Sequence, residues 1–239
     1  LPAETERVAG SVLFLHGNAE NISNHLASVA WLPERGFNVL LVDYRGYGAS
    51  EGAATLAGAA ADSRRALAYL AAREGEGVPL AVLGQSLGGG LAPYAVAGSK
   101  VRGRVAAVVL DSAFAGFRRI AREKLAGFWL TWPLQVPLSW TVPDDYSAGR
   151  FIGDLSPIPV LIIHGTADRI VPAANAWALH ARAQEPRALW LIEAAGHIRS
   201  LRRESTRDRL ADYLWRQLAG QESQPPPVSP GPGFRLDTR

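Results

Sequence analysis

The sequence predicts an α/β fold with a mostly parallel, doubly wound sheet flanked by helices. Six short runs rich in Val, Leu and Ile recur along the 239 residues, and segments with helical periodicity separate them. Apolar runs without alternation are typical of strands buried on both faces, and strands that alternate with helices form parallel sheets. The six runs are Ser11 to His16, Phe37 to Asp43, Pro79 to Gly84, Val105 to Asp111, Ile158 to His164 and Ala188 to Glu193.

Three stretches between and after these runs have helical periodicity. Leu56 to Ala72 carries spaced charges among small apolar residues, and Ala173 to Ala183 follows Pro172, a residue type favoured at helix starts. The third stretch, Ile198 to Leu218, repeats leucine at helical spacing. Helices should therefore cover the sheet, and ligands of such open sheets bind at the carboxyl ends of the strands.

Residues 1–220 are predicted to form one domain, because a chain of this length with 48% hydrophobic residues can bury one large core. The last segment, 221–239, is rich in proline and poor in apolar residues, so we expect a disordered tail. The chain holds no methionine, even at position 1. We therefore expect that a native N-terminal segment is missing.

The composition argues against several classes of protein. The formal charge is +3 and the arginines are scattered, which disfavours a nucleic-acid partner. The lack of cysteine excludes disulfides, thiolate zinc sites and a cysteine nucleophile, but leaves the cellular compartment open. No apolar stretch is long enough to cross a bilayer, so membrane association is expected only through a missing N-terminal segment.

Two glycine-rich stretches lack the residues that a nucleotide site requires. Gly46-Tyr47-Gly48 has no third glycine at the dinucleotide spacing, and Gly84 to Gly90 has no following Lys-Ser or Lys-Thr pair. Neither stretch supports a nucleotide cofactor.

The segment Gly84-Gln85-Ser86-Leu87-Gly88 comes directly after the third apolar run and reads G-x-S-x-G. In a strand-to-helix turn of this kind, the flanking glycines avoid backbone collisions, and the Ser86 hydroxyl is lifted out of the sheet. The N–H groups at the start of the next helix point to where negative charge develops in acyl transfer. The pattern predicts that Ser86 is a nucleophile. The alternative is a helix-capping turn whose serine only satisfies backbone donors.

A serine nucleophile needs a base to take its proton and a carboxylate to orient that base. Of the five histidines, His197 follows the sixth apolar run on a loop of small residues, although it could also be a surface cap of the last helix. Asp168 lies just past the fifth run, which gives the chain order Ser, Asp, His. Asp111, at the end of the fourth run, is the competing acid. We expect Asp111 to brace its adjacent loop and Asp43 to tie down its own turn.

The negative charge that forms on a substrate oxygen needs two hydrogen-bond donors. Leu87 supplies one N–H directly after the nucleophile. The second is expected from the loop after the first run, where Gly17 lets the backbone turn inward. We place this donor at Asn18, with Ala19 as the near alternative, and expect His16 to brace the loop.

Six motifs are spread along the chain: His16 to Ala19, Asp43 to Gly52, Gly84 to Gly89, Asp111 to Phe114, His164 to Asp168 and Gly196-His197. Together they resemble the motifs of the α/β-hydrolases, in the abhydrolase-domain and serine-aminopeptidase-like branch, and the resemblance covers nearly everything before the tail. The resemblance implies a Ser-His-Asp hydrolase without metal or organic cofactor, and the serine disfavours dehalogenase and epoxide hydrolase activities. Members usually have two strands before the His-Gly loop. Only Leu1 to Gly10 precede it here, so we expect that these strands are missing and that a sheet edge is exposed.

The longest insertion, about 112–157, is predicted to form a small cap. Its aromatic segments, Phe128 to Pro133 and Pro137 to Trp140, are expected either to line an apolar acyl pocket or to pack the insertion onto the sheet. The leading hypothesis is hydrolysis of a small-molecule carboxylic ester or thioester through an acyl-enzyme. The alternatives are peptide hydrolysis by the same three residues, which the lack of an acidic run disfavours, and a catalytically silent ligand-binding domain.

Overall fold

The computed structural model describes residues 1–18, 20–127 and 130–220, and its strands form one sheet in the order β2-β1-β3-β4-β5-β6. All neighbouring strands are parallel, which confirms the predicted fold class. Each predicted run forms a strand, with small shifts at the ends. The strands are β1 Gly10–Leu15, β2 Phe37–Val42, β3 Leu80–Gln85, β4 Val105–Asp111, β5 Val160–Gly165 and β6 Arg187–Ile192.

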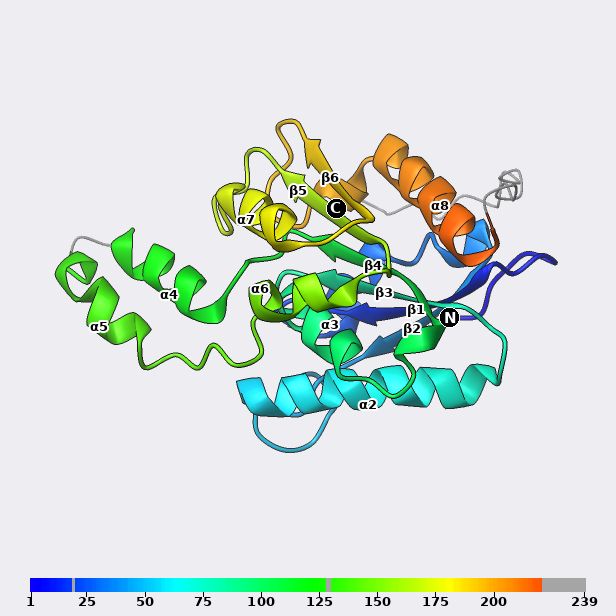
Figure 1. The fold of residues 1–239 in the computed structure, drawn as a ribbon, viewed down its shortest axis with the longest axis horizontal. Coiled ribbons are helices and arrows are strands. Elements are labelled where there is room, and N and C mark those ends of the chain that lie inside the picture. Colours follow the sequence, from blue (N-terminus) through cyan, green and yellow to red (C-terminus); the bar gives the residue numbers. More distant parts are fainter. Residues whose placement is uncertain (19, 128–129, 221–239) are drawn as a thin grey trace, which may run out of the picture.

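Helices connect the strands and cover both faces of the sheet (Figure 1). The α-helices are α1 Ile22–His25, α2 Leu56–Glu74, α3 Leu87–Ala97, α4 Phe117–Ala126, α5 Gln135–Ser139, α6 Ala148–Phe151, α7 Ala174–Arg182 and α8 Glu204–Leu218. Short 3-10 helices are η1 Leu26–Ser28, η2 Pro33–Arg35, η3 Arg102–Arg104, η4 Trp132–Leu134, η5 Ile152–Leu155 and η6 Ser200–Arg202.

Two apolar layers lie on opposite faces of the sheet. In β1, Leu13 and Leu15 pack in the layer that includes α2, α3, α6 and α7, whereas Val12 and Phe14 pack in the layer that includes α8. Successive side chains of a strand point to opposite faces, so a strand covered on both sides needs apolar residues at every position. This explains why the apolar runs of the sequence do not alternate.

The last helix begins later than the sequence predicts. The expected start is Ile198, but α8 begins at Glu204, after the 3-10 helix η6. Ile198 has a φ of 52°, outside the right-handed helical region, and its N–H donates to Ser112 Oγ at 3.1 Å. A hydrogen bond to the β4 loop thus holds this segment out of the helix.

The predicted cap divides into two parts. The helices α6 and η5 pack on α3, whereas α4 and α5 pack on each other and form a hairpin that projects from the body (Figure 1). We call residues 117–126 and 130–143 the arm.

No helix in the described part of the chain is long and apolar enough to span a bilayer.

The first residues lie beside the edge of the sheet. β2 is an end strand, and Leu1 exchanges two backbone hydrogen bonds with Val39, at 2.9 and 2.8 Å. These bonds cover one point of the edge that the sequence predicts to be exposed. The predicted tail, 221–239, lies outside the described residues.

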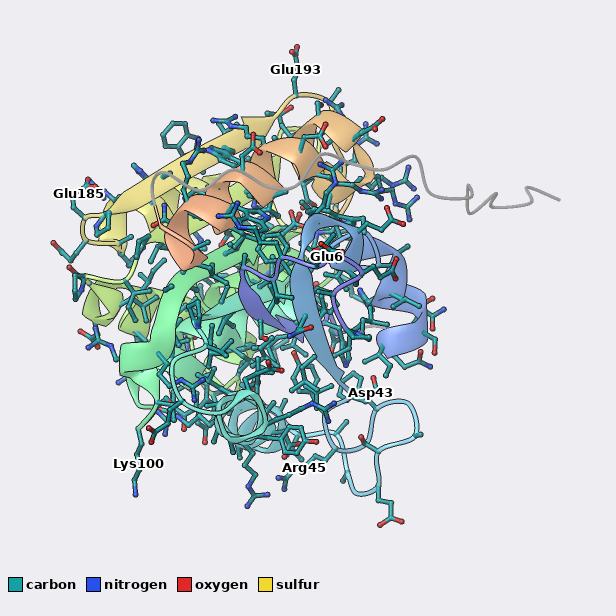
Figure 2. The ribbon with its side chains drawn as sticks, turned by 90° about the vertical axis from the view of Figure 1, so that its right-hand side faces the viewer. Glu6, Asp43, Arg45, Lys100, Glu185 and Glu193 are labelled. Carbon is teal, nitrogen blue, oxygen red and sulfur yellow. The ribbon has the colours of Figure 1, made fainter. Side chains whose placement is uncertain are left out.

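Charged side chains are spread around the surface. Lys100, Glu185 and Glu193 point outward at separate places on the rim of the molecule (Figure 2). Arg45 is paired with Asp62 at 2.6 Å. This distribution matches the scattered charges of the sequence.

Trp215 of α8 is the largest side chain that is fully buried, and its Nε1 donates to Arg35 O at 2.7 Å. We expect Trp215→Ala to lower the free energy of unfolding by about 3–5 kcal/mol, because it opens a cavity and leaves a carbonyl unpaired. Trp177→Ala is the matched control, since Trp177 is 56% exposed. Its effect should stay within about 0.5 kcal/mol in urea titrations. Equal losses in the two variants would contradict this packing.

Candidate active site

Ser86 lies in a strained turn between β3 and α3. Its φ is 52° and its ψ is −109°, a conformation that places the side chain above the carboxyl end of the strand. A Cβ on Gly84 would lie 2.5 Å from Gly88 O, and a Cβ on Gly88 would collide with the backbone of Leu15. Glycine is therefore required at both flanking positions, for the reason that the sequence motif suggests.

The structure brings the three predicted residues Ser86, Asp168 and His197 together. Nε2 of His197 lies 3.0 Å from Ser86 Oγ, and Nδ1 of His197 lies 2.8 Å from Asp168 Oδ2. A carboxylate only accepts hydrogen bonds, so the Asp168 contact favours a proton on Nδ1 and leaves Nε2 to accept from the serine hydroxyl. The side chains form one continuous hydrogen-bonded row across the ends of three strands.

The carboxylate of Asp168 is held in place by its own loop. Oδ1 accepts the N–H groups of Ile170 and Val171, both at 2.8 Å. Burial acts to raise the pKa of Asp168, but the hydrogen bonds from His197 and from the two amides outweigh it and hold the pKa below its usual value. The group is therefore ionised near neutral pH and can orient the imidazole.

A second histidine, His164, lies beside the carboxylate of Asp168 on its buried side. His164 is fully buried, and its Nε2 lies 2.8 Å from Val171 O and 3.5 Å from Asp168 Oδ2. Burial lowers the pKa of His164, so its ring is neutral near pH 7. The sequence pattern does not predict a separate role for His164. The one available signal was its position at the end of the fifth apolar run, directly before the loop that carries Asp168.

The two predicted backbone donors lie at the same cavity as Ser86. Leu87 is the first residue of α3, where the N–H groups have no partner within the helix, and both Leu87 and Asn18 line the cavity. Tyr47, which the sequence analysis assigned no function, donates its hydroxyl to Asn18 Oδ1 at 2.7 Å. This bond fixes the Asn18 loop. The alternative donor, Ala19, lies outside the described residues.

The loop after β1 is attached to the first turn of α3. His16 O accepts the N–H of Gly88 at 3.0 Å, and the ring of His16 is buried, with Nδ1 2.7 Å from Gly17 O. His16 thus braces the loop, as the sequence predicts. The carboxylate of Asp43 reaches farther than its own turn, because its Oδ1 accepts the N–H of Ile22 at 2.8 Å.

Asp111, which the sequence offers as the competing acid, forms its side-chain hydrogen bonds with Gln85 and Ser112, whereas His197 Nδ1 is paired with Asp168. Asp111 Oδ2 accepts from Gln85 Nε2 at 2.9 Å, and Asp111 Oδ1 lies 3.5 Å from the hydroxyl of Ser112, which itself accepts the Ile198 N–H. Burial raises the pKa of Asp111 to about 6. The residue therefore braces the loop that presents His197.

The cavity beside Ser86 has a volume of about 590 Å³. The arm contributes Ile120, Ala121, Lys124, Thr141, Val142 and Pro143 to its lining. The described tryptophans of the cap do not contribute, because Trp132 is 61% exposed and Trp140 is 71% exposed. For these two side chains, the expectation that they line the pocket or pack on the sheet is wrong. Trp129 lies outside the described residues.

The parallel sheet, the serine turn and the histidine–aspartate row define an α/β-hydrolase of the Ser-His-Asp arrangement. The chain belongs to the family described as "Serine aminopeptidase, S33", whose model matches residues 6–152. The branch that the motifs resemble is thereby confirmed. The match includes Ser86, whereas Asp168 and His197 lie beyond its end and are assigned from geometry.

One curated relative is similar to this chain over most of its length, and two solved structures share its fold. The protein YfhR of Escherichia coli O157:H7 is 37% identical over 222 residues, which is 91% of this chain and 72% of YfhR. The esterase Pf2001 of Pyrococcus furiosus has a TM-score of 0.68 at 21% identity, over 88% of this chain and 84% of the esterase. The monoglyceride lipase of Saccharomyces cerevisiae, as a soluble variant, has a TM-score of 0.65 at 18% identity, over 91% and 89% of the two chains.

Asp111→Asn tests the buried carboxyl behind the site. Because the folded pKa lies near 6 and the unfolded pKa near 4, the fold retains a proton that the unfolded chain releases. Protonation of Asp111 therefore stabilises the folded state. This stabilisation is complete below the pKa of the unfolded state and is lost as the pH rises through the pKa of the folded state. Relative to Asp111→Asn, the wild type should lose on the order of 2–3 kcal/mol between about pH 4 and pH 7.

Urea titrations at several pH values measure this loss. Asp145→Asn is the control for the loss of a carboxylate, because the Asp145 side chain is 73% exposed. A constant free-energy difference between wild type and Asp111→Asn at all pH values would contradict the buried, proton-retaining carboxyl.

Proposed function

We propose that the chain is a serine hydrolase that cleaves carboxylic esters or thioesters through an acyl-enzyme. The observation that carries the proposal is the continuous row from Ser86 through His197 to Asp168, with spacings of 3.0 and 2.8 Å. Such a row gives a serine hydroxyl the base that it otherwise lacks.

The chemistry follows from the three roles. Ser86 Oγ attacks the acyl carbon while His197 Nε2 takes the hydroxyl proton, and the same proton then passes to the departing alcohol or thiol as its bond to the acyl carbon breaks. Water repeats the sequence on the acyl-enzyme, which releases the acid and restores the serine. Asp168 stabilises the imidazolium that forms in both steps.

The developing oxyanion would be held by the N–H groups of Leu87 and Asn18. Leu87 is at the positive end of α3, whose eleven residues span Leu87–Ala97, and this end favours negative charge. Removal of one such donor typically costs about 3 kcal/mol of transition-state stabilisation. The cavity that both residues line is therefore suited to acyl transfer.

The cavity lining favours an apolar acyl group over a peptide. Among the described residues that line it there is no Asp or Glu to bind a substrate ammonium, and Phe114, Phe117 and Ile120 form an apolar wall. The similarity to an esterase and a lipase supports acyl-ester substrates. Peptide hydrolysis is the second candidate, because the family description is that of an aminopeptidase.

Ser86→Ala tests the proposal directly. The wild type should hydrolyse p-nitrophenyl acetate or butyrate and take up one equivalent of a fluorophosphonate, as intact mass spectrometry measures. Ser86→Ala should show no labelling, and kcat should fall by roughly 10³-fold or more in Ser86→Ala and His197→Ala. Ser205→Ala, which changes an exposed serine of α8, is the matched control.

The results separate the candidate functions. Folded wild type that neither reacts with the fluorophosphonate nor cleaves esters would overturn the proposal. Faster cleavage of dipeptide amides than of matched esters would favour the peptidase. Recovery of a bound ester intact after long incubation would favour a ligand-binding domain without catalysis.

Tyr47→Phe tests the oxyanion loop without changing the three side chains of the row. The substitution removes the hydroxyl that binds Asn18 Oδ1 at 2.7 Å and should let the loop move. We expect kcat/KM for a p-nitrophenyl ester to fall about fivefold, the value of one hydrogen bond. Tyr69→Phe, at an exposed tyrosine of α2, should leave it unchanged. Equal kcat/KM values for Tyr47→Phe and wild type would show that the Tyr47 hydroxyl does not support the oxyanion loop.

A further inference from the structure

Exposed large apolar side chains are concentrated in one segment of the arm. Elsewhere in the described chain, exposed large apolar residues occur singly or in small groups, but six of them lie within residues 130–140. The six are Leu130, Trp132, Leu134, Val136, Leu138 and Trp140. Concentrated apolar exposure of this kind marks a contact surface.

Packing within the protein does not account for these side chains. The contacts of α4 and α5 are mainly with each other and with η4, so the arm extends away from the sheet (Figure 1). Trp132 is 61% exposed and Trp140 is 71% exposed, the two highest values among the described large apolar residues. Tryptophan combines an apolar ring with an N–H donor, and it is enriched where hydrocarbon meets water in membranes.

The arm also carries an excess of positive charge. Between residues 117 and 143 the sequence has four basic residues, Arg118, Arg119, Arg122 and Lys124, and one acidic residue, Glu123. Glu123 accepts from Arg119 at 2.8 Å. The remaining three basic side chains are exposed on α4. Their charge is complementary to phosphate groups at an anionic lipid surface.

The apolar, basic arm lies directly against the cavity at Ser86. Three residues of the arm line this cavity: Ile120 and Lys124 from α4, and Val142 from the segment after α5. The arm therefore forms part of the wall of the cavity at Ser86.

We propose that the arm is a docking surface for an anionic lipid bilayer. Trp132, Trp140 and Leu134 enter the boundary between headgroups and acyl chains, and the α4 cations contact lipid phosphates. This proposal places membrane contact on the arm, whereas the sequence led us to expect it only through a missing N-terminal segment. Docking does not depend on the proposed hydrolysis. If both hold, the ester substrate is an amphiphile taken from the lipid phase.

Vesicle binding by the Ser86→Ala protein tests docking apart from hydrolysis. Sucrose-loaded vesicles of phosphatidylcholine, with and without phosphatidylglycerol, are sedimented with the protein. We expect binding to the anionic vesicles at ~0.1 M NaCl and much weaker binding at ~0.5 M NaCl or to the neutral vesicles. No binding of folded protein to anionic vesicles would overturn the proposal, whatever the result of the ester assays.

Variants of the arm assign the binding to its residues. The double change Trp132→Ala and Trp140→Ala should weaken binding by more than about tenfold. Tyr69→Ala, which removes an aromatic ring that is 55% exposed on α2, should leave binding unchanged. In a chain that retains Ser86, the double change should leave hydrolysis of a soluble p-nitrophenyl ester within about twofold of wild type, because neither tryptophan lines the cavity.

Charge variants give an independent test. Arg118→Ser with Arg122→Ser should weaken binding to anionic vesicles by on the order of tenfold at low salt. Arg73→Ser with Lys100→Ser, at exposed cations outside the arm, should not (Figure 2 shows Lys100). Unchanged binding of either arm variant would overturn the proposal. So would a dimer that dissociates on the double tryptophan change without any vesicle binding, because the arm would then join two copies of the chain.

Discussion

Two backbone hydrogen bonds hold the Ser86 turn between its neighbours, and the other parts of the site are placed relative to them. Ser86 N–H donates to Asp111 O at 2.9 Å, and Gly88 N–H donates to His16 O at 3.0 Å. The first bond attaches the turn to the end of β4, and the second attaches it to the loop after β1. Because both bonds come from the backbone, they tolerate many side chains but require the close approach that Gly88 permits.

A polar network continues this arrangement beneath the surface. His25 Nδ1 lies 3.1 Å from Gln85 Oε1, and Gln85 Nε2 donates to Asp111 Oδ2 at 2.9 Å. Ser112 then accepts the Ile198 N–H at 3.1 Å, directly after His197. Gln85, the variable position of the G-x-S-x-G motif, thus connects α1 to the loop that presents His197. Buried networks of this kind are effective only when each member is paired.

The sequence predicts the sheet and the three side chains of the row because parallel strands all end at one edge. Ser86, Asp168 and His197 each follow an apolar run, so the fold class alone places them at the same side. The start of α8 and the roles of Tyr47 and His164 were not predictable in this way, since they depend on contacts between segments far apart in the chain. The arm is a similar case: an aromatic-rich insertion has the same pattern whether its rings face a pocket or the solvent.

The unusual backbone angles near the site limit how the protein can be stabilised. Ser86, Ser112, Ala194 and Ile198 all have positive φ without being glycine, and all four follow strands at the carboxyl edge. Each such residue costs of order 1–3 kcal/mol. Substitution by glycine would relieve this strain, yet it would also free the chain to adopt other angles there. Selection for heat resistance and selection for a well-aligned imidazole should therefore favour different residues at position 198.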